Sequence, residues 1–285
     1  MMKLSLSARI AEQAHIKDRT AVSFEDLARL ASEIGYRALC IRPSLVTVET
    51  PDEEIRRMRT IMDRHGLQAS MASPRRETAA STPDSGQPLR DLSRDVEVAD
   101  LLGARLIRIS IKTEEDARWA QRAADQARER DISLVQQTHT HSPCETIDQC
   151  LEVVARISRP NFGLCVEPAN LLLCGQDYGP EAIQRLGPHI FNVYVQNLRM
   201  DEEGSSHIKT NRGIVRYERL IVGEEGAVGK RGIDFDRFFQ GLKSIQYDGF
   251  VTSHQPCVEG MGVPELARFV HDRLIAHIDS DSDPV

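Results

Sequence analysis

Short apolar runs alternate with longer amphipathic stretches along almost the whole chain. The apolar runs are about four to seven residues long and are bounded by Gly, Pro or polar residues, as at 36–41 and 104–110. Runs of this length are typical of buried strands, whereas a stretch such as 24–34 has the spacing of a helix, with Ser23 as its cap and Gly35 as its end. The pattern therefore predicts that strands and helices alternate.

The alternation can be followed through eight units. The expected strands are 3–7, 36–41, 67–71, 104–110, 132–135, 162–166, 190–195 and 249–253. Eight strand-plus-helix units at a spacing of roughly 30 residues predict an α/β protein, a single-domain (β/α)8 TIM barrel over residues 1–278. A doubly wound open sheet is the alternative, but it usually has a Gly-rich phosphate turn after its first strand, and the stretch SLSARIAEQ has none.

Three segments interrupt the rhythm. Residues 73–87 form a polar stretch that we expect to be a loop, and the acidic end 279–285 is expected to be a disordered tail. The segment from about 199 to 232 lies between the seventh and eighth units and is too long for a simple connection. It carries Lys209 and Arg212 between glycines, so we expect it to fold over the mouth of the barrel as a lid.

Composition narrows the classes of partner. The chain has 40% hydrophobic and 28% charged residues and a formal net charge of −7, so nucleic acid is not an expected partner. No stretch approaches the roughly 20 apolar residues of a membrane span. The six cysteines form no CxxC pair, which predicts free buried thiols and a cytoplasmic protein. The sequence is compatible with a homo-oligomer.

Polar side chains gather where the expected strands end. Glu167 follows the apolar run 162–166 directly, and the carboxyl ends of barrel strands are where active sites lie. The other strand ends carry Arg42, Gln137, His139, Asn170, Tyr194, Gln196 and His254. We expect a common site, although a salt-bridged Glu167, an Arg42 paired with a neighbouring helix, a helix-capping His139 and an inward core position for Tyr194 are open alternatives.

These motifs resemble the xylose isomerase-like TIM barrel family of sugar isomerases, epimerases and endonuclease-IV-type enzymes. The segments PLRDLSRDVEVADLLGARLIRI and GIDFDRFFQGLKSIQYDGFVTSHQP are similar to family segments around strands four and eight. The resemblance implies a (β/α)8 barrel and one divalent metal, held by three carboxylates and a histidine. It also implies that two glutamates move protons in the epimerases.

The ligand pattern of the family is altered in this sequence. Gln137, Glu167 and His254 stand where the resemblance places a Glu, an Asp and a Glu, and Tyr194 stands where it places a His. The expected metal ligands are Gln137, Glu167, Gln196 and His254, which would hold one divalent Mn, Mg or Zn ion with only one carboxylate. A site with fewer anionic ligands would bind the cation less tightly.

The substitutions also change the expected catalysis. Gln137 cannot act as a base, so acid–base work is expected from His139, Glu167 and His254. Arg42 and Tyr194 are expected to bind the substrate, and the lid to add a contact from Lys209 or Arg212.

Two classes of function follow. The first is a metal-dependent isomerase- or epimerase-like enzyme that moves a proton next to the carbonyl of a sugar, keto-sugar or cyclitol, or a dehydratase or lyase for the same carbohydrates. The second is a sugar-binding barrel that has lost its metal and its activity. DNA repair fits poorly, because the chain is acidic and one strand-end carboxylate is too few for a multi-metal site.

Overall fold

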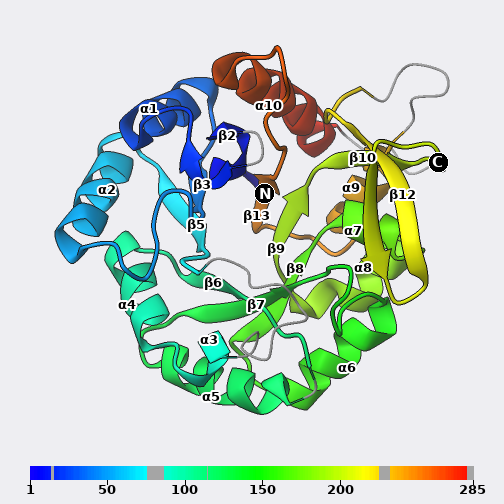
Figure 1. Ribbon diagram of the computed structural model, residues 1–285, viewed down its shortest axis with the longest axis horizontal. Coiled ribbons are helices and arrows are strands. Elements are labelled where there is room, and N and C mark those ends of the chain that lie inside the picture. Colours follow the sequence, from blue (N-terminus) through cyan, green and yellow to red (C-terminus); the bar gives the residue numbers. More distant parts are fainter. Residues whose placement is uncertain (14–15, 76–86, 114, 225–231, 281–285) are drawn as a thin grey trace.

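The computed structural model describes residues 1–13, 16–75, 87–113, 115–224 and 232–280. Eight parallel strands close into a barrel, and helices surround it as a ring (Figure 1), which confirms the predicted TIM-barrel fold. Around the barrel the strands follow the order β1 (Lys3–Ser7), β13 (Phe250–Ser253), β9 (Ile190–Val195), β8 (Phe162–Val166), β7 (Ser133–Gln137), β6 (Leu106–Ile109), β5 (Gln68–Ala72) and β4 (Ala38–Ile41).

The helices of the ring agree closely with the sequence pattern. The longer ones are α1 (Phe24–Ile34), α2 (Asp52–Arg64), α4 (Ser93–Leu102), α5 (Asp116–Arg128), α6 (Ile147–Ile157), α8 (Pro180–Leu186), α9 (Phe235–Ser244) and α10 (Val263–Asp279). The shorter ones are η1 (Ala8–Ala11), α3 (Gln87–Arg90), α7 (Pro168–Leu173) and η2 (Gly187–His189). Helices α3 and α4 are separate, because the Asp91 carboxylate accepts the Ser93 N–H at 3.0 Å where the second of them begins.

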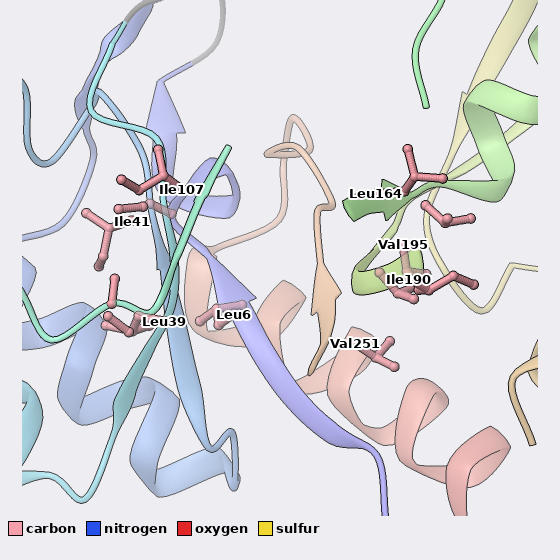
Figure 2. Close-up of a cluster of buried hydrophobic side chains, with 14 of the residues drawn as sticks. Leu6, Leu39, Ile41, Ile107, Leu164, Ile190, Val195 and Val251 are labelled. Atoms are coloured by element: carbon pink, nitrogen blue, oxygen red, sulfur yellow. The ribbon is translucent and has the colours of Figure 1, made fainter. Parts of the chain in front are cut away.

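The two faces of the barrel strands have different roles. Side chains such as Leu6, Leu39, Ile107 and Val251 belong to the large apolar core that includes the surrounding helices (Figure 2). The alternate positions face inward and form a second, smaller apolar cluster: Cys40, Met71, Leu106, Val135, Cys165 and Tyr194. This inner cluster fills the barrel below the strand ends, so a site at those ends has a closed floor.

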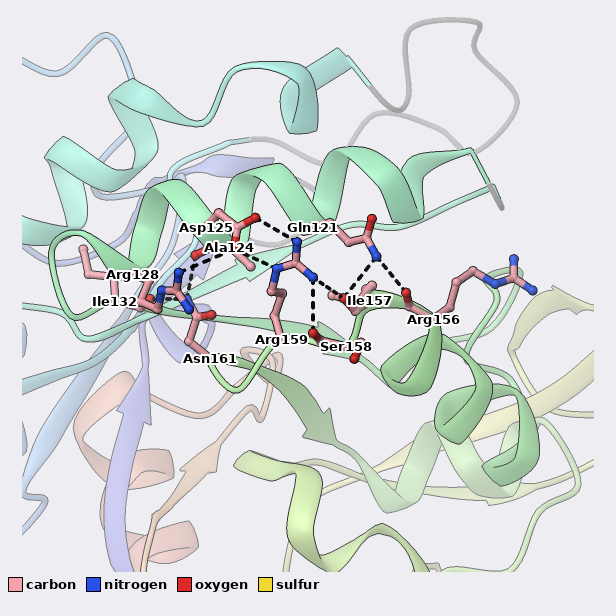
Figure 3. A network of polar contacts seen from close by, with 10 residues as sticks. All are labelled: Gln121, Ala124, Asp125, Arg128, Ile132, Arg156, Ile157, Ser158, Arg159 and Asn161. Atoms are coloured by element: carbon pink, nitrogen blue, oxygen red, sulfur yellow. Dashed lines mark hydrogen bonds and ion pairs between the residues drawn. The ribbon is translucent and has the colours of Figure 1, made fainter.

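A polar network fixes the start of β8, the strand that leads to Glu167 (Figure 3). Arg159, in the turn before β8, forms a two-point ion pair with Asp125 of α5, with nitrogen–oxygen distances of 2.7 and 2.9 Å. Asn161 donates to the carbonyls of Ala124 and Ile132 at 2.8 and 3.0 Å. These contacts tie the turn to α5 and so set the position at which β8 enters the barrel.

A small antiparallel sheet occupies much of the predicted insertion. Strands β10 (Asn197–Met200), β11 (Ser206–Thr210) and β12 (Gly213–Leu220) lie in the order β10-β12-β11, outside the barrel (Figure 1). Sequence patterning predicted an irregular lid here, and it also missed the short hairpin of β2 (Glu12–Gln13) and β3 (Ile16–Thr20). Residues 225–231 of the expected insertion lie outside the described residues.

The tip of the β11–β12 hairpin is fastened to the loop after β7. The buried Glu145 carboxylate accepts the Asn211 N–H at 2.8 Å and also accepts the His141 N–H. The neighbouring Arg212 lies against Gly175, where an added Cβ would be only 1.6 Å from Arg212 Nη1. The hairpin is therefore held at the carboxyl end of the barrel by contacts at its turn.

The remaining structural expectations concern the end of the chain, the polar loop, membrane spans and the cysteines. Helix α10 continues to Asp279, and residues 281–285 of the predicted tail lie outside the described residues, as do 76–86 of the predicted polar loop. Across the described part of the chain, no helix combines the length and the apolar character that a membrane crossing requires. All six cysteines are free thiols, and only Cys257 is not fully buried.

We predict that Glu145→Gln loosens the β11–β12 hairpin. The amide cannot accept as strongly as the carboxylate, and a charge-assisted hydrogen bond contributes about 1.5–3 kcal/mol. Amide hydrogen exchange within 206–220 should become about tenfold faster or more, as measured by mass spectrometry. Glu152→Gln, an exposed change on α6, is the matched control, and equal exchange in both variants would contradict the role given to Glu145.

Candidate active site

A pocket of about 240 Å³ opens at the carboxyl ends of the strands. Five of its side chains follow a member of the inner apolar cluster by two residues; for example, Cys165 is followed by Glu167 and Val135 by Gln137. The lining residues are Arg9, Arg42, Arg108, Gln137, His139, Glu167, Asn170, Leu173, Gln196, Asn197, Leu198, Ile208, Tyr217, Arg219, His254 and Pro256. The pocket is smaller than the roughly 300–1,000 Å³ typical of sites for drug-sized ligands, which suits a small metabolite.

Glu167 is completely buried between amide donors. Its Oε2 accepts from Asn170 Nδ2 at 2.7 Å and from Gln137 Nε2, and its backbone N–H donates to Thr138 Oγ1 at 2.9 Å. Pro168 begins α7 directly after Glu167, so Asn170 lies one helical turn away from the carboxylate that it binds. Oε1 of Glu167 is buried and has no hydrogen-bond partner among the described residues.

The environment of Glu167 favours its protonated form. Burial raises the pKa of this carboxyl, and the Arg9 charge and the Gln137 hydrogen bond oppose the shift without cancelling it. Gln196 lies close enough to favour the ionised form, although it makes no hydrogen bond of normal geometry. A carboxyl with a raised pKa is a stronger base once it has lost its proton, which suits proton transfer near neutral pH.

Gln137 connects the carboxylate to a cation. Its Nε2 donates to Glu167, while its Oε1 accepts from Arg108 Nη1. Both ends of the amide are therefore engaged, and a carboxylate in its place could not donate to Glu167. The side chain thus transmits the favourable charge of Arg108 to Glu167.

His254 lies beside this network, directly after the last barrel strand, β13. Its Nδ1 is hydrogen-bonded to Ser7 Oγ at 3.2 Å, and its ring stacks on Tyr194 with centroids 4.0 Å apart. Burial lowers the pKa of His254 far below its usual value, and the charges of Arg9 and Arg42 act in the same direction. The imidazole is therefore neutral at neutral pH.

The other residues predicted for the site differ in their placement. His139 lines the pocket, with its Nδ1 donating to the Thr140 carbonyl at 2.8 Å. Tyr194 is buried under His254, with its hydroxyl 3.2 Å from Cys40 Sγ, as in the alternative of an inward core residue. Lys209 and Arg212 are exposed and are absent from the pocket lining, and Ile208, Tyr217 and Arg219 line it from the same hairpin instead.

Sequence reasoning missed three arginines of the pocket. Arg108 lies two residues after the inward Leu106, so the period-2 alternation of β6 carried a signal for it. Arg9 lies on η1, directly after β1, where the sequence shows no comparable pattern. Arg219 enters the pocket through the register of β12 against β10, which pairs Leu198 with Arg219.

The four residues expected to bind metal line one pocket, but their donor set does not fit a divalent cation. Glu167 is the only carboxylate that the described residues contribute to the lining, and the oxygen of Gln137 is already held by Arg108. The arginine charges that lower the pKa of His254 would also repel a metal ion beside it. Within the described ranges no three His, Cys, Asp or Glu side chains are grouped to hold one.

Solved structures with the same fold include enzymes of several kinds. D-psicose 3-epimerase in the presence of D-fructose matches with a TM-score of 0.73 at 14% identity, over 97% of this chain and 99% of that one. The probable 3-DHS dehydratase AsbF of Bacillus anthracis, involved in petrobactin synthesis, matches with a TM-score of 0.68 at 14% identity, over 96% and 99% of the two chains. Identities this low establish a shared fold alone.

A related barrel has been solved with a metal. The xylose isomerase-like TIM barrel protein of Mycobacterium smegmatis in complex with magnesium matches with a TM-score of 0.68 at 15% identity, over 98% of this chain and 97% of that one. None of the curated proteins matches this sequence. The family model described as xylose isomerase-like TIM barrel matches residues 28–273. The chain therefore belongs to the xylose isomerase-like TIM barrel family.

Proposed function

We propose that this protein is an isomerase- or epimerase-like enzyme that moves a proton next to the carbonyl of a small polyhydroxylated compound. The observation that carries the proposal is the unpartnered Oε1 of Glu167, in the same pocket as a neutral His254. A carboxylate base with a neutral imidazole is a pairing that suits proton transfer between adjacent carbons. The family also contains sugar isomerases and epimerases, which supports this class of reaction.

The reaction can be written with these groups alone. Glu167 Oε1 takes the proton from the carbon next to the carbonyl, and the electron pair of the broken C–H bond moves to the carbonyl oxygen. The resulting enediolate oxygen lies in a pocket lined by Arg108, whose guanidinium stabilises the negative charge. His254 moves a proton from the hydroxyl oxygen to the former carbonyl oxygen. Glu167, whose acidic proton exchanges with solvent, gives a proton to the former carbonyl carbon, so no atom is gained or lost.

The arginines supply the electrophile that a divalent ion would otherwise provide. Three arginine charges lower the pKa of His254, those of Arg9, Arg42 and Arg108. These arginines therefore lie close to the reacting groups. Fixed positive charges in a water-poor pocket stabilise developing negative charge without reorganising. The proposal therefore departs from the metal-dependent reaction that the family resemblance implied.

Two other outcomes use the same pocket. A dehydratase would begin with the same proton abstraction by Glu167 and then expel a hydroxyl group from the neighbouring carbon. A barrel that only binds carbohydrate would leave the C–H bond intact. Both are distinguishable from an isomerase by the fate of the hydrogen and the mass of the product.

We predict that the protein exchanges a carbon-bound hydrogen of its substrate with solvent deuterium. A panel of keto-sugars, aldo-sugars, cyclitols, sugar acids and sugar phosphates incubated in D₂O would be read by mass spectrometry and NMR. Glu167→Gln should lower the exchange rate by about 10²–10⁴-fold, the usual contribution of a general base. A product lighter by one water would identify the dehydratase instead.

The control for this experiment is Glu152→Gln, which removes an exposed carboxylate on α6. It should exchange hydrogen at the rate of the unaltered protein. If Glu167→Gln is as active as Glu152→Gln, Glu167 is not the base. If the unaltered protein exchanges no hydrogen with any member of the panel, the proposed function is wrong.

We predict that activity survives removal of divalent metals. Because the pocket has one carboxylate and several arginines, dialysis against EDTA should leave the exchange rate within about twofold. Elemental analysis of the purified protein should find far less than one metal ion per chain. Loss of activity that Mn²⁺, Mg²⁺ or Zn²⁺ restores would contradict the argument from the donor set.

A further inference from the structure

Three arginines reach the pocket from separate parts of the fold. Arg9 comes from η1 after β1, Arg42 follows β4, and Arg219 lies on β12 of the hairpin at the mouth. Arg108 is a fourth, and it is joined to Gln137 near Glu167. The described residues of the lining thus include four guanidinium groups and a single carboxylate, which gives this part of the pocket an excess of positive charge.

The guanidinium of Arg9 has no hydrogen-bond partner among the described residues. No described residue accepts a hydrogen bond from its guanidinium or forms an ion pair with it, although the side chain is half-buried in the pocket. Burial, and after it the charge of Arg42, lowers the pKa of Arg9 to about 10. The like charges of Arg9 and Arg42 repel each other in the pocket, and a bound anion would relieve that repulsion.

Arg42 is held in place by one of its nitrogens. Its Nε donates to the buried Glu12 carboxylate at 2.7 Å, and Ser44 Oγ donates to the same oxygen at 3.0 Å. In the described part of the structure its two terminal nitrogens have no hydrogen-bond partner. A guanidinium fixed through Nε keeps both terminal N–H groups free for the bidentate recognition of an oxyanion.

Arg219 is positioned at the rim by an aromatic ring. Its Cζ lies 5.8 Å from the centre of the Tyr217 ring, and its Nη2 donates to the Tyr217 hydroxyl at 3.3 Å. The positive charge of Arg219 also acts on Arg9, which places the two groups near each other. The hairpin therefore adds a cation to the same side of the pocket as Arg9 and Arg42.

We propose that Arg9, Arg42 and Arg219 bind an oxyanion group of the substrate, either a carboxylate or a phosphate. The reacting carbons of that substrate lie at Glu167 and His254. This inference rests on the proposed function for the location of the reacting carbons. The anion-binding part rests on the three guanidinium groups. Substrates are then sugar acids or sugar phosphates, and neutral sugars are excluded by the unmatched charge.

Calorimetric titration of the full chain tests the proposal with D-gluconate, D-fructose 6-phosphate, inorganic phosphate and the neutral D-fructose. At least one anionic sugar should bind ten times more tightly than D-fructose. Arg9→Gln and Arg42→Gln should each weaken that binding by about 10–100-fold, because the loss of a hydrogen bond to a charged group reduces the affinity by about this factor. Arg57→Gln on α2 removes an exposed arginine outside the pocket and should change the affinity by less than twofold.

The outcomes separate the anion site from the reaction. Tighter binding of gluconate identifies a carboxylate site, whereas tighter binding of fructose 6-phosphate and inorganic phosphate identifies a phosphate site. Glu167→Gln should keep the affinity for the anion while losing hydrogen exchange. If the unaltered protein binds the anion but exchanges no hydrogen, only the proposed function is overturned. The anion site is overturned if D-fructose binds as tightly as the anions, or if Arg9→Gln and Arg42→Gln bind as the unaltered protein does.

Discussion

The buried carboxylate of Glu167 is the constraint on which the pocket depends. Removing a carboxylate from water costs several kcal/mol unless hydrogen bonds and opposite charges compensate. Two amides, from Gln137 and Asn170, supply the hydrogen bonds, and Arg9 and Arg108 supply the charge. The network around Glu167 offsets part of the cost of its burial, and the remaining cost appears as the raised pKa of this carboxyl.

The positions at which the ligand pattern of the family is altered have a common electrostatic explanation. A second carboxylate at position 137 would repel Glu167 unless a metal lay between them, whereas Gln137 donates to Glu167 and accepts from Arg108. His254 and Gln196 are likewise neutral beside the arginines. Each of these neutral side chains is compatible with neighbouring guanidinium groups, so the neutral side chains and the arginines of the pocket form one electrostatic arrangement.

The sequence predicted the barrel well, because apolar runs, caps and glycines are local signals. Glu167 and His254 were found because they follow such runs directly. Arg219 could not be predicted, since it reaches the pocket through the pairing of β12 with β10, and strand register is not encoded locally. Without the strand register, the hairpin was expected to contact the substrate through Lys209 or Arg212. In the structure the turn of the hairpin is held away from the pocket by contacts with Glu145 and Gly175.

The charge of the pocket contrasts with that of the whole chain. With a formal net charge of −7, the protein repels an anion at long range, although salt screens this repulsion beyond about 8 Å at physiological ionic strength. The arginines act inside the pocket, where the side chain of Arg42 is only 12% exposed and that of Arg9 is half-buried, so their charges are screened less. Recognition of an anion therefore depends on short-range contacts rather than on steering, and differences in affinity between substrates should arise mainly in their dissociation rates.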